Sequence, residues 1–173
     1  MGLAFAQLDN TPIGPISFAA GDRGLQRVAF TPLPALRQGL AQQDAPPSLA
    51  GFETVQNLLV ELNAYLHGLQ RVFSVRVDWE VLAGFQRQVL QLTAEIPYGQ
   101  VFTYAEIAQK LGKPGAARAV GTALGRNPMP VVIPCHRVVG ADGALRGYLG
   151  GEGVKVFLLA LEGHAVNNRK LVK

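Results

Sequence analysis

TYAEIAQKLGKPGAARAVGTALG, residues 103–125, predicts two short helices joined by a tight turn. Thr103 and Glu106 have the spacing of a capping box, in which each side chain satisfies a backbone donor at a helix start, and Gly112 suits the end of that helix. The second helix, from Ala116 onward, consists mostly of small residues that permit close packing. Such a pair is typical of a helix-turn-helix, although many helical hairpins of this kind bind nothing.

Positive charge accumulates in the half of the chain that contains this helix pair. The 173 residues carry a net charge of +4, but residues 1–81 hold five Arg against seven acids, and residues 82–173 hold eleven Lys or Arg against five acids. The net charge is thus −2 in the first part and +6 in the second. This asymmetry favours a polyanionic partner, although a solvated basic face is the commoner cause of surplus Lys and Arg. Arg118, near the start of the second helix, strengthens the expectation of nucleic acid.

The only cysteine, Cys135, stands beside His136 in NPMPVVIPCHRVVG, residues 127–140. A free thiol has a pKa of about 8.5, so a nucleophilic cysteine needs a base or a positive neighbour, and His136 is the candidate base. The apolar VVI predicts a buried extended segment, in which neighbouring side chains point to opposite faces. A turn at Pro134 or a bridging water would then have to connect the two groups. The alternative is that Cys135 is a small buried hydrophobic residue.

A partner for His136 is available at the end of the last predicted helix, EGVKVFLLALEG, residues 152–163. Glu162 lies at the negative end of the helix dipole, a position that costs about 0.3–1 kcal/mol for a carboxylate. Pairing with His136 would explain this placement, and a solvated terminal glutamate is the alternative.

The first part of the chain has the pattern of a separate α+β domain. Residues 52–68 have a helical apolar stripe that ends near Gly68, and RVFSVRVDW, residues 71–79, predicts a further strand. The domains predicted on this basis are residues 1–81 and residues 82–173. Apolar runs between turn-rich stretches predict a β-meander or hairpins at residues 3–8, 14–19 and 25–30.

Composition excludes several classes of protein. No stretch approaches the roughly 20 apolar residues of a membrane span, and the N-terminus lacks the pattern of a secretory signal, so we expect no membrane association and a cytoplasmic protein. One cysteine cannot form an internal disulfide. The histidines are scattered, which gives no metal-ligand spacing, and we expect no metal and no cofactor. They are His67, His136 and His164.

The motifs together resemble the O6-alkylguanine-DNA alkyltransferase family. PCHRVVG (134–140) follows GRNPMPVVI and precedes GYLGG (147–151) and VKVFLLALEG (154–163). FQRQVL and IPYGQVFTYAEIAQKLGKPGAARAVG extend the resemblance over residues 84–163, and GPI, GLQRVAF and VDW are similar to the family's variable companion domain. The resemblance implies an α+β fold, with a small ribonuclease-H-like N-terminal α/β domain before a mostly helical C-terminal domain with a helix-turn-helix.

The resemblance also implies roles for residues that match the family's motifs. Cys135 would attack the alkyl carbon on O6 of guanine, and His136, held by Glu162 and acting through a water, would take the thiol proton. Tyr104 would donate a proton to the departing base. Asn127 would brace the recognition helix and the active-site turn.

The same resemblance implies a contact surface for double-stranded DNA and a pocket for the alkylated base. The nucleotide would have to flip out of the duplex, because a thiolate cannot approach the alkyl carbon inside the base stack. Arg118 would enter the duplex and fill the gap that the flipped nucleotide leaves. Small residues on the second helix would allow close approach to the minor groove. The other DNA-contacting residues would be Thr103, Ala116, Ala117, Ala119, Gly121 and Arg126, and the pocket residues Tyr148, Leu149 and Val138.

The expected function is therefore direct-reversal DNA repair, in which each molecule transfers one alkyl group from O6 of guanine, and also from O4 of thymine, to its own Cys135. We expect a monomer that needs no protein partner. The alternatives are a lesion sensor without enzymatic activity, which in the related group has Trp in place of Cys135, a helix-turn-helix regulator and a cysteine hydrolase. Leu90 and Leu149 depart from the family's usual residues, and Leu149 affects the range of alkyl groups that would be accepted.

Overall fold

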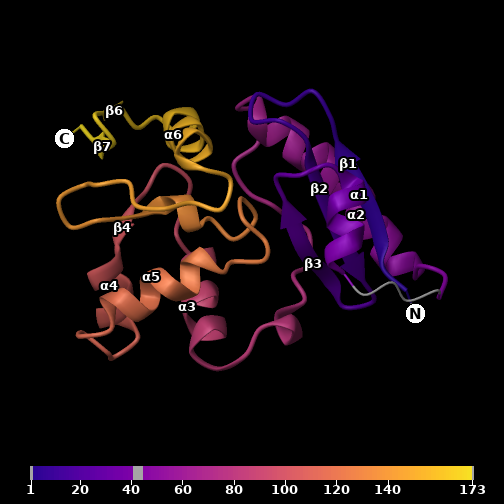
Figure 1. Cartoon of the computed structure of the whole chain (residues 1–173), viewed down its shortest axis with the longest axis horizontal. Coiled ribbons are helices and arrows are strands. Elements are labelled where there is room, and N and C mark those ends of the chain that lie inside the picture. The colour runs from indigo at the N-terminus through magenta and orange to yellow at the C-terminus, as the bar shows by residue number, and fades with distance from the viewer. Residues whose placement is uncertain (1, 41–44, 173) are drawn as a thin grey trace. The chain divides into compact units, whose positions relative to one another are not determined.

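The computed structural model of the chain, which describes residues 2–40 and 45–172, divides it into two compact units, Met1–Val81 and Leu82–Lys173 (Figure 1). Mixed α/β structure, as expected, is distributed unequally between them. Among the described residues, the first unit contains the three-stranded sheet, and the second contains four of the six α-helices and strands of two residues each.

The first unit is built on an antiparallel meander of β1 (Ala4–Leu8), β2 (Ile16–Gly21) and β3 (Gly24–Ala29). The central strand β2 is buried along its whole length, because it pairs on both sides and both helices contact it. These helices are α1 (Leu33–Gly39) and α2 (Leu49–Leu66), which begins at the cap residue Ser48 and contacts all three strands. The predicted meander is confirmed.

The strand predicted at residues 71–79 is wrong. The segment makes a single parallel bridge, between Val77 and Leu25, before the short 3₁₀ helix η1 (Trp79–Val81) begins. Leu25 N–H donates to Arg76 O at 2.8 Å, and Asp78 N–H donates to Leu25 O at 2.9 Å. The Asp78 carboxylate then accepts from the Glu80 N–H and turns the chain away from β3, which ends the pairing after one residue.

The second unit begins with α3 (Gly84–Ala94), followed by β4 (Phe102–Thr103), α4 (Tyr104–Lys110) and α5 (Ala117–Gly125). The three helices pack on one another, as Figure 1 shows. The predicted capping box at the start of α4 is confirmed: Glu106 N–H donates to Thr103 Oγ1, and the Glu106 carboxylate accepts from the Thr103 N–H. Leu90 is fully buried in α3, so its departure from the family pattern falls in the core.

Residues 127–140 are mostly buried, but the predicted extended conformation at VVI is wrong. Pro130 and Ile133 bridge each other across a tight turn, and Val131 has φ +73°, which is unusual for a β-branched residue. Cys135 and His136 then lie in the 3₁₀ helix η2 (Cys135–Arg137), capped by Pro134, and not on opposite faces of a strand. The turn at Pro134 considered from the sequence is therefore present. The strand β5 (Val138–Val139) follows and pairs with β4 in parallel.

The chain continues through α6 (Glu152–Leu161) and the hairpin of β6 (Val166–Asn167) and β7 (Lys170–Leu171). Leu159 of α6 packs with Val139 and Leu145 in a buried cluster that joins the helix to β5. The final turn of α6 is thereby placed next to η2. Within residues 2–40 and 45–172 no helix has the length and apolarity needed to span a membrane.

Candidate active site

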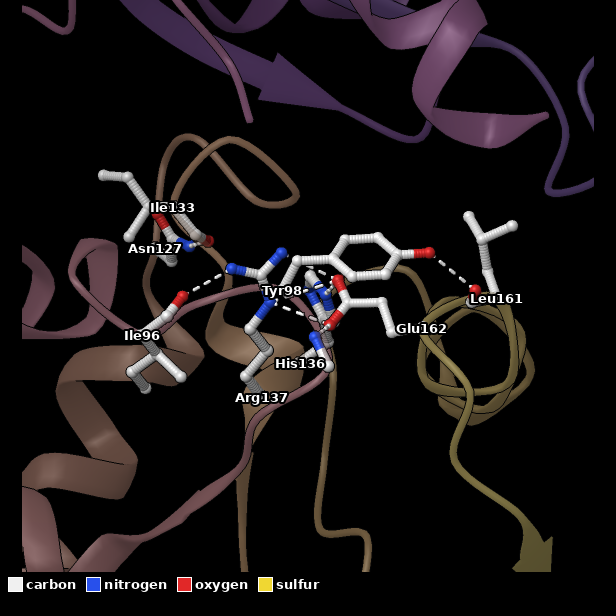
Figure 2. A network of polar contacts seen from close by, with 9 residues as sticks. Ile96, Tyr98, Asn127, Ile133, His136, Arg137, Leu161 and Glu162 are labelled. Carbon is white, nitrogen blue, oxygen red and sulfur yellow. Dashed lines mark hydrogen bonds and ion pairs between the residues drawn. The ribbon is translucent and has the colours of Figure 1, made fainter. Parts of the chain in front are cut away.

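A buried carboxylate, Glu162, joins the polar side chains of His136 and Arg137, the two residues that follow Cys135 (Figure 2). His136 Nε2 lies 2.9 Å from Glu162 Oε1, and the Arg137 guanidinium donates to both carboxylate oxygens at 2.8–3.1 Å. Gly99 N–H donates to Oε2 at 3.1 Å, and Gly99 needs its φ of +75° to approach so closely. The predicted pairing of Glu162 with His136 is present, and a carboxylate that accepts from Nε2–H leaves Nδ1 as the basic ring nitrogen.

Arg137 was not anticipated from the sequence, although it stands next to His136. It is buried together with its acidic partner, and its Nη1 donates to Ile96 O in the segment after α3. Tyr98 packs against the same network, because its ring lies under the Arg137 guanidinium and its hydroxyl donates to Leu161 O at 2.7 Å. An arginine in a buried segment requires a carboxylate partner. The position of Arg137 inside the apolar segment around Cys135 could therefore have indicated its pairing with Glu162.

The electrostatics keep His136 in its basic form. Burial lowers the pKa of His136, the hydrogen bond and charge of Glu162 act in the opposite direction, and the charges of Arg137 and Lys155 lower it further. The imidazole is therefore neutral at pH 7 and can accept a proton. The positive charge of Arg137 balances Glu162, so that the carboxylate orients His136 without holding it in the imidazolium form.

The Cys135 thiol lies against the Asn127 side chain. Asn127 also holds the turn around Val131, which precedes Cys135 in the chain. Asn127 Nδ2 donates to Cys135 Sγ at 3.1 Å and to Ile133 O at 2.9 Å, and Asn127 Oδ1 accepts from Met129 N–H at 3.0 Å. Burial raises the pKa of Cys135, whereas hydrogen bonds from Asn127 and Tyr148 and the charge of Lys155 oppose this rise. Because the net shift is upward, the thiol needs a base to ionise at neutral pH.

Lys155 is a second functional candidate that sequence reasoning missed. It lies on α6, is 1% exposed, and donates to Val138 O at 2.7 Å and Arg146 O at 3.3 Å. Burial lowers its pKa to about 8, and the charge of Cys135 acts in the opposite direction. The buried ammonium therefore supplies positive potential near the sulfur and joins β5 to the loop before α6. No clear signal for this role is present in the sequence, because position 155 lies beside the apolar stripe of Val154, Phe157, Leu158 and Leu161.

An open cavity of about 830 Å³ lies between α5 and the loop before α6. From α5 it is lined by Ala117, Arg118, Gly121, Thr122 and Gly125. On the other side it is lined by Tyr104, Arg146, Gly147, Tyr148 and Leu149. The family resemblance implied different roles for several of these residues: proton donation to the base, DNA contact and the base pocket. In the structure they line one cavity. They are Tyr104, Ala117, Arg118, Gly121, Tyr148 and Leu149.

The other predicted contact residues lie near this cavity without lining it. Thr103 caps α4, Ala116 caps α5, and Ala119 and Arg126 line a smaller cavity of about 330 Å³ beside α3. Val138 is buried in β5 and offers its carbonyl to Lys155, and it does not line the larger cavity. Within the described residues no cluster of three or more His, Cys, Asp or Glu could hold a metal ion.

Replacing Glu162 with Gln should lower the free energy of unfolding by about 3–5 kcal/mol, because Arg137 would be left as a buried charge without a compensating carboxylate. Glu152→Gln is the matched control, since that glutamate begins α6 and pairs with Arg169 on the surface. The control should cost about 0–1 kcal/mol. Denaturant titrations of both variants measure the difference, and equal losses would contradict a structural role for the buried network.

Lys155 should make stability depend on pH. Its folded pKa of about 8 lies below its ordinary 10.5, so between these values the unfolded chain binds more protons and the free energy of unfolding rises with pH. The slope approaches about 1.4 kcal/mol per pH unit. The Cys135 thiol titrates with the opposite sign, and because the Lys155 charge opposes the rise in the pKa of that thiol, this contribution is at least as large in Lys155→Met, which lacks the lysine contribution. Unfolding measurements at pH 8 and 9.5 should show the wild type gaining about 1 kcal/mol or more relative to this variant, and parallel curves would refute the shifted pKa.

Known proteins resemble this chain along most of its length. Residues 84–164 match the family model for the 6-O-methylguanine DNA methyltransferase DNA binding domain. A methylated-DNA–protein-cysteine methyltransferase of Methanosarcina acetivorans is 42% identical over 154 residues, which cover 88% of this chain and 94% of that protein. The crystal structure of Mycobacterium tuberculosis O6-methylguanine methyltransferase is 38% identical with TM-score 0.74, and that of M. tuberculosis OGT in complex with DNA is 38% identical with TM-score 0.72. Each structure match covers 92% of both chains.

The second unit is thus a DNA-binding domain that also carries a buried thiol and a histidine–carboxylate pair. The chain belongs to the methylated-DNA–protein-cysteine methyltransferase family.

Proposed function

We propose that the protein repairs alkylated DNA by direct reversal, moving the alkyl group from O6 of guanine to its own Cys135. The observation that supports this most directly is the position of the single thiol, which contacts Asn127 and is adjacent in η2 to a histidine held by Glu162. The thioether product is not reversed by thiol exchange, and the chain has no second cysteine. Each molecule therefore acts once.

Proton transfer begins at the thiol. His136 Nδ1 accepts the thiol proton through a bridging water, while Glu162 keeps the proton on Nε2 and fixes the ring. The resulting thiolate is stabilised by the Asn127 amide and by the positive charge of Lys155. Neutral His136 is the form that this step requires, and the lowered pKa of its imidazole maintains it.

Tyr104 supplies a proton at the base edge. Tyr104 lines the cavity, and the pKa of its phenol is raised by burial and by the charge of Cys135, with Arg146 acting in the opposite direction. A tyrosine with a raised pKa remains protonated and can donate to guanine as the bond from the alkyl carbon to O6 breaks. The sulfur forms its bond to the same carbon, guanine leaves with the proton from Tyr104, and the tyrosinate regains a proton from protonated His136 through solvent, so that the net reaction moves the thiol proton to guanine.

Access to the base requires nucleotide flipping, and α5 has the surface for it. Arg118 is exposed at the first turn of α5 and lines the cavity beside Gly121, which lies against the Tyr104 ring. In this proposal α4 and α5 form the helix-turn-helix, and Arg118 fills the place of the flipped nucleotide. Thr103, Ala116, Ala117, Ala119, Gly121 and Arg126 provide backbone and phosphate contacts.

O4-alkylthymine is a second substrate of the same thiol, and Val138 supports the pocket from behind through its contact with Lys155. The meander and its two helices correspond to a reduced ribonuclease-H-like companion domain. The protein works as a monomer in the cytoplasm, because the proposed mechanism needs no residue from a second copy and acts on cellular DNA.

Incubation with DNA containing O6-methylguanine, followed by intact-mass measurement, separates this function from the alternatives. Methyl transfer adds one methylene to the protein and leaves unmodified guanine in the DNA. A lesion sensor or a helix-turn-helix regulator would bind the DNA without any change in mass. A cysteine hydrolase would regenerate its thiol and release the alkyl group into solution.

Leu149→Ala should increase the rate on O6-benzylguanine relative to O6-methylguanine DNA. Leu149 is 53% exposed and lines the cavity, so its side chain takes space that a bulky adduct would need. Discrimination in such an apolar pocket is typically about 1–3 kcal/mol per methylene-scale misfit. Single-turnover rates on both substrates measure the ratio, and the melting temperature should change little because the side chain is exposed. An unchanged ratio with a lower melting temperature would instead place Leu149 in the core.

A further inference from the structure

Arg146 is the one cation in the cavity wall to which the mechanism assigns no role. It stands immediately before GYLGG, is exposed, and lines the cavity on the side opposite Arg118. Among the described residues it forms no ion pair, and the ten residues that line the cavity include two arginines and neither Asp nor Glu. The cavity therefore has positive charge with no internal acid to neutralise it.

The backbone of Arg146 is held next to the reaction centre. Its carbonyl accepts from Lys155 Nζ at 3.3 Å and from the Tyr104 hydroxyl at 3.5 Å. Its guanidinium is also close enough to Tyr104 to lower the pKa of that phenol, against the larger effect of burial. The positive charge thus acts on the hydroxyl group that faces the departing base. Because both hydrogen bonds are made to the backbone carbonyl, replacing the side chain removes the charge and keeps this anchor.

We propose that Arg146 is a specificity-determining residue that favours alkyl groups carrying a carboxylate, of which O6-carboxymethylguanine is the smallest. This inference rests on the proposed function. A carboxylate beside the reacting carbon repels an approaching thiolate and loses solvation when it enters the cavity. A guanidinium in the wall offsets both effects by accepting the carboxylate as a charge-assisted, two-point partner.

The transfer itself is unchanged by the carboxylate. The Cys135 sulfur forms a bond to the methylene carbon, the bond from that carbon to O6 breaks with its electron pair remaining on the oxygen, and a proton from Tyr104 neutralises guanine. The product is S-carboxymethylcysteine, whose carboxylate remains beside Arg146. No oxidant or further reactant is needed.

The test compares two adducts of equal size in the same duplex, O6-carboxymethylguanine and its neutral isostere O6-carbamoylmethylguanine. The measured quantity is the ratio of their single-turnover rates, acid over amide, so that any change in DNA affinity cancels. Arg146→Gln should lower this ratio about five- to tenfold, and Arg146→Lys should retain most of it. Lys113→Gln, which removes a charge outside the cavity wall, should leave the ratio as in the wild type.

Each other outcome has a distinct meaning. If Arg146→Gln slows both adducts equally, the side chain contacts a DNA phosphate and the inference is wrong. An unchanged ratio with unchanged rates would also overturn it. A wild type that transfers neither these groups nor a methyl group would refute the proposed function itself. Methyl transfer by each variant, together with its melting temperature, shows that a lowered ratio does not come from misfolding.

Discussion

Cys135→Ala protein should transfer no alkyl group at all, yet it should still bind DNA. The thiol is the only acceptor that the mechanism provides, and the substitution leaves α4, α5 and the basic surface in place. Mass spectrometry after incubation with O6-methylguanine DNA should therefore find the variant unmodified, while a gel-shift or anisotropy titration should find affinity close to that of the wild type.

Two outcomes would contradict this expectation. A gain in mass by the alanine variant would reveal another acceptor, and loss of DNA binding would show that Cys135 supports the fold of the contact surface. Circular dichroism of the variant provides the control for folding. Cys135→Ser is a useful companion, because its hydroxyl keeps a polar partner for Asn127 but is a far weaker nucleophile than a thiolate.

Arg118→Ala should slow repair of duplex DNA by about tenfold to a hundredfold, and it should affect reaction with the free O6-alkylguanine base much less. Only the duplex requires a nucleotide to be extruded, at a cost of a few kcal/mol that an inserted side chain helps to offset. Single-turnover rates on the two substrates give the comparison. Binding of the wild type should also weaken steeply as salt is added.

Arg126→Ala is the matched control for Arg118, since it removes the same charge from the other end of α5, outside the larger cavity. It should reduce DNA affinity and the salt dependence of binding without a selective effect on flipping. Equal slowing of Arg118→Ala on duplex and free base would reject insertion into the duplex.

The sequence predicted correctly those helices and strands whose ends are marked by capping or turn residues in the sequence itself. The meander and the capped helix α4 follow from turn residues, apolar periodicity and the Thr103–Glu106 box. The segment at residues 71–79 has strand-like composition but only one bridge, because Asp78 uses its side chain to turn the chain. Such a local competition between side chain and backbone is not visible in periodicity.

The part of the candidate site that could be predicted is the contact between an acidic and a basic side chain. The parts that could not be predicted are those in which tertiary contacts determine the backbone conformation or the burial of a residue. A carboxylate at the wrong end of α6 indicated a partner, and Glu162 does contact His136. The left-handed conformation of Val131 was not predictable, because it depends on Asn127 holding both ends of the turn. Lys155 looked like an ordinary helix lysine until the fold enclosed it.

The most direct measurement is a titration of the native protein with an excess of duplex DNA containing O6-methylguanine. Repaired guanine should increase to one equivalent per protein molecule and then stop. Intact-mass and peptide analysis should find one added methylene, on Cys135 alone. Continued repair beyond one equivalent, or a methyl group on any other residue, would contradict single-turnover transfer to this thiol.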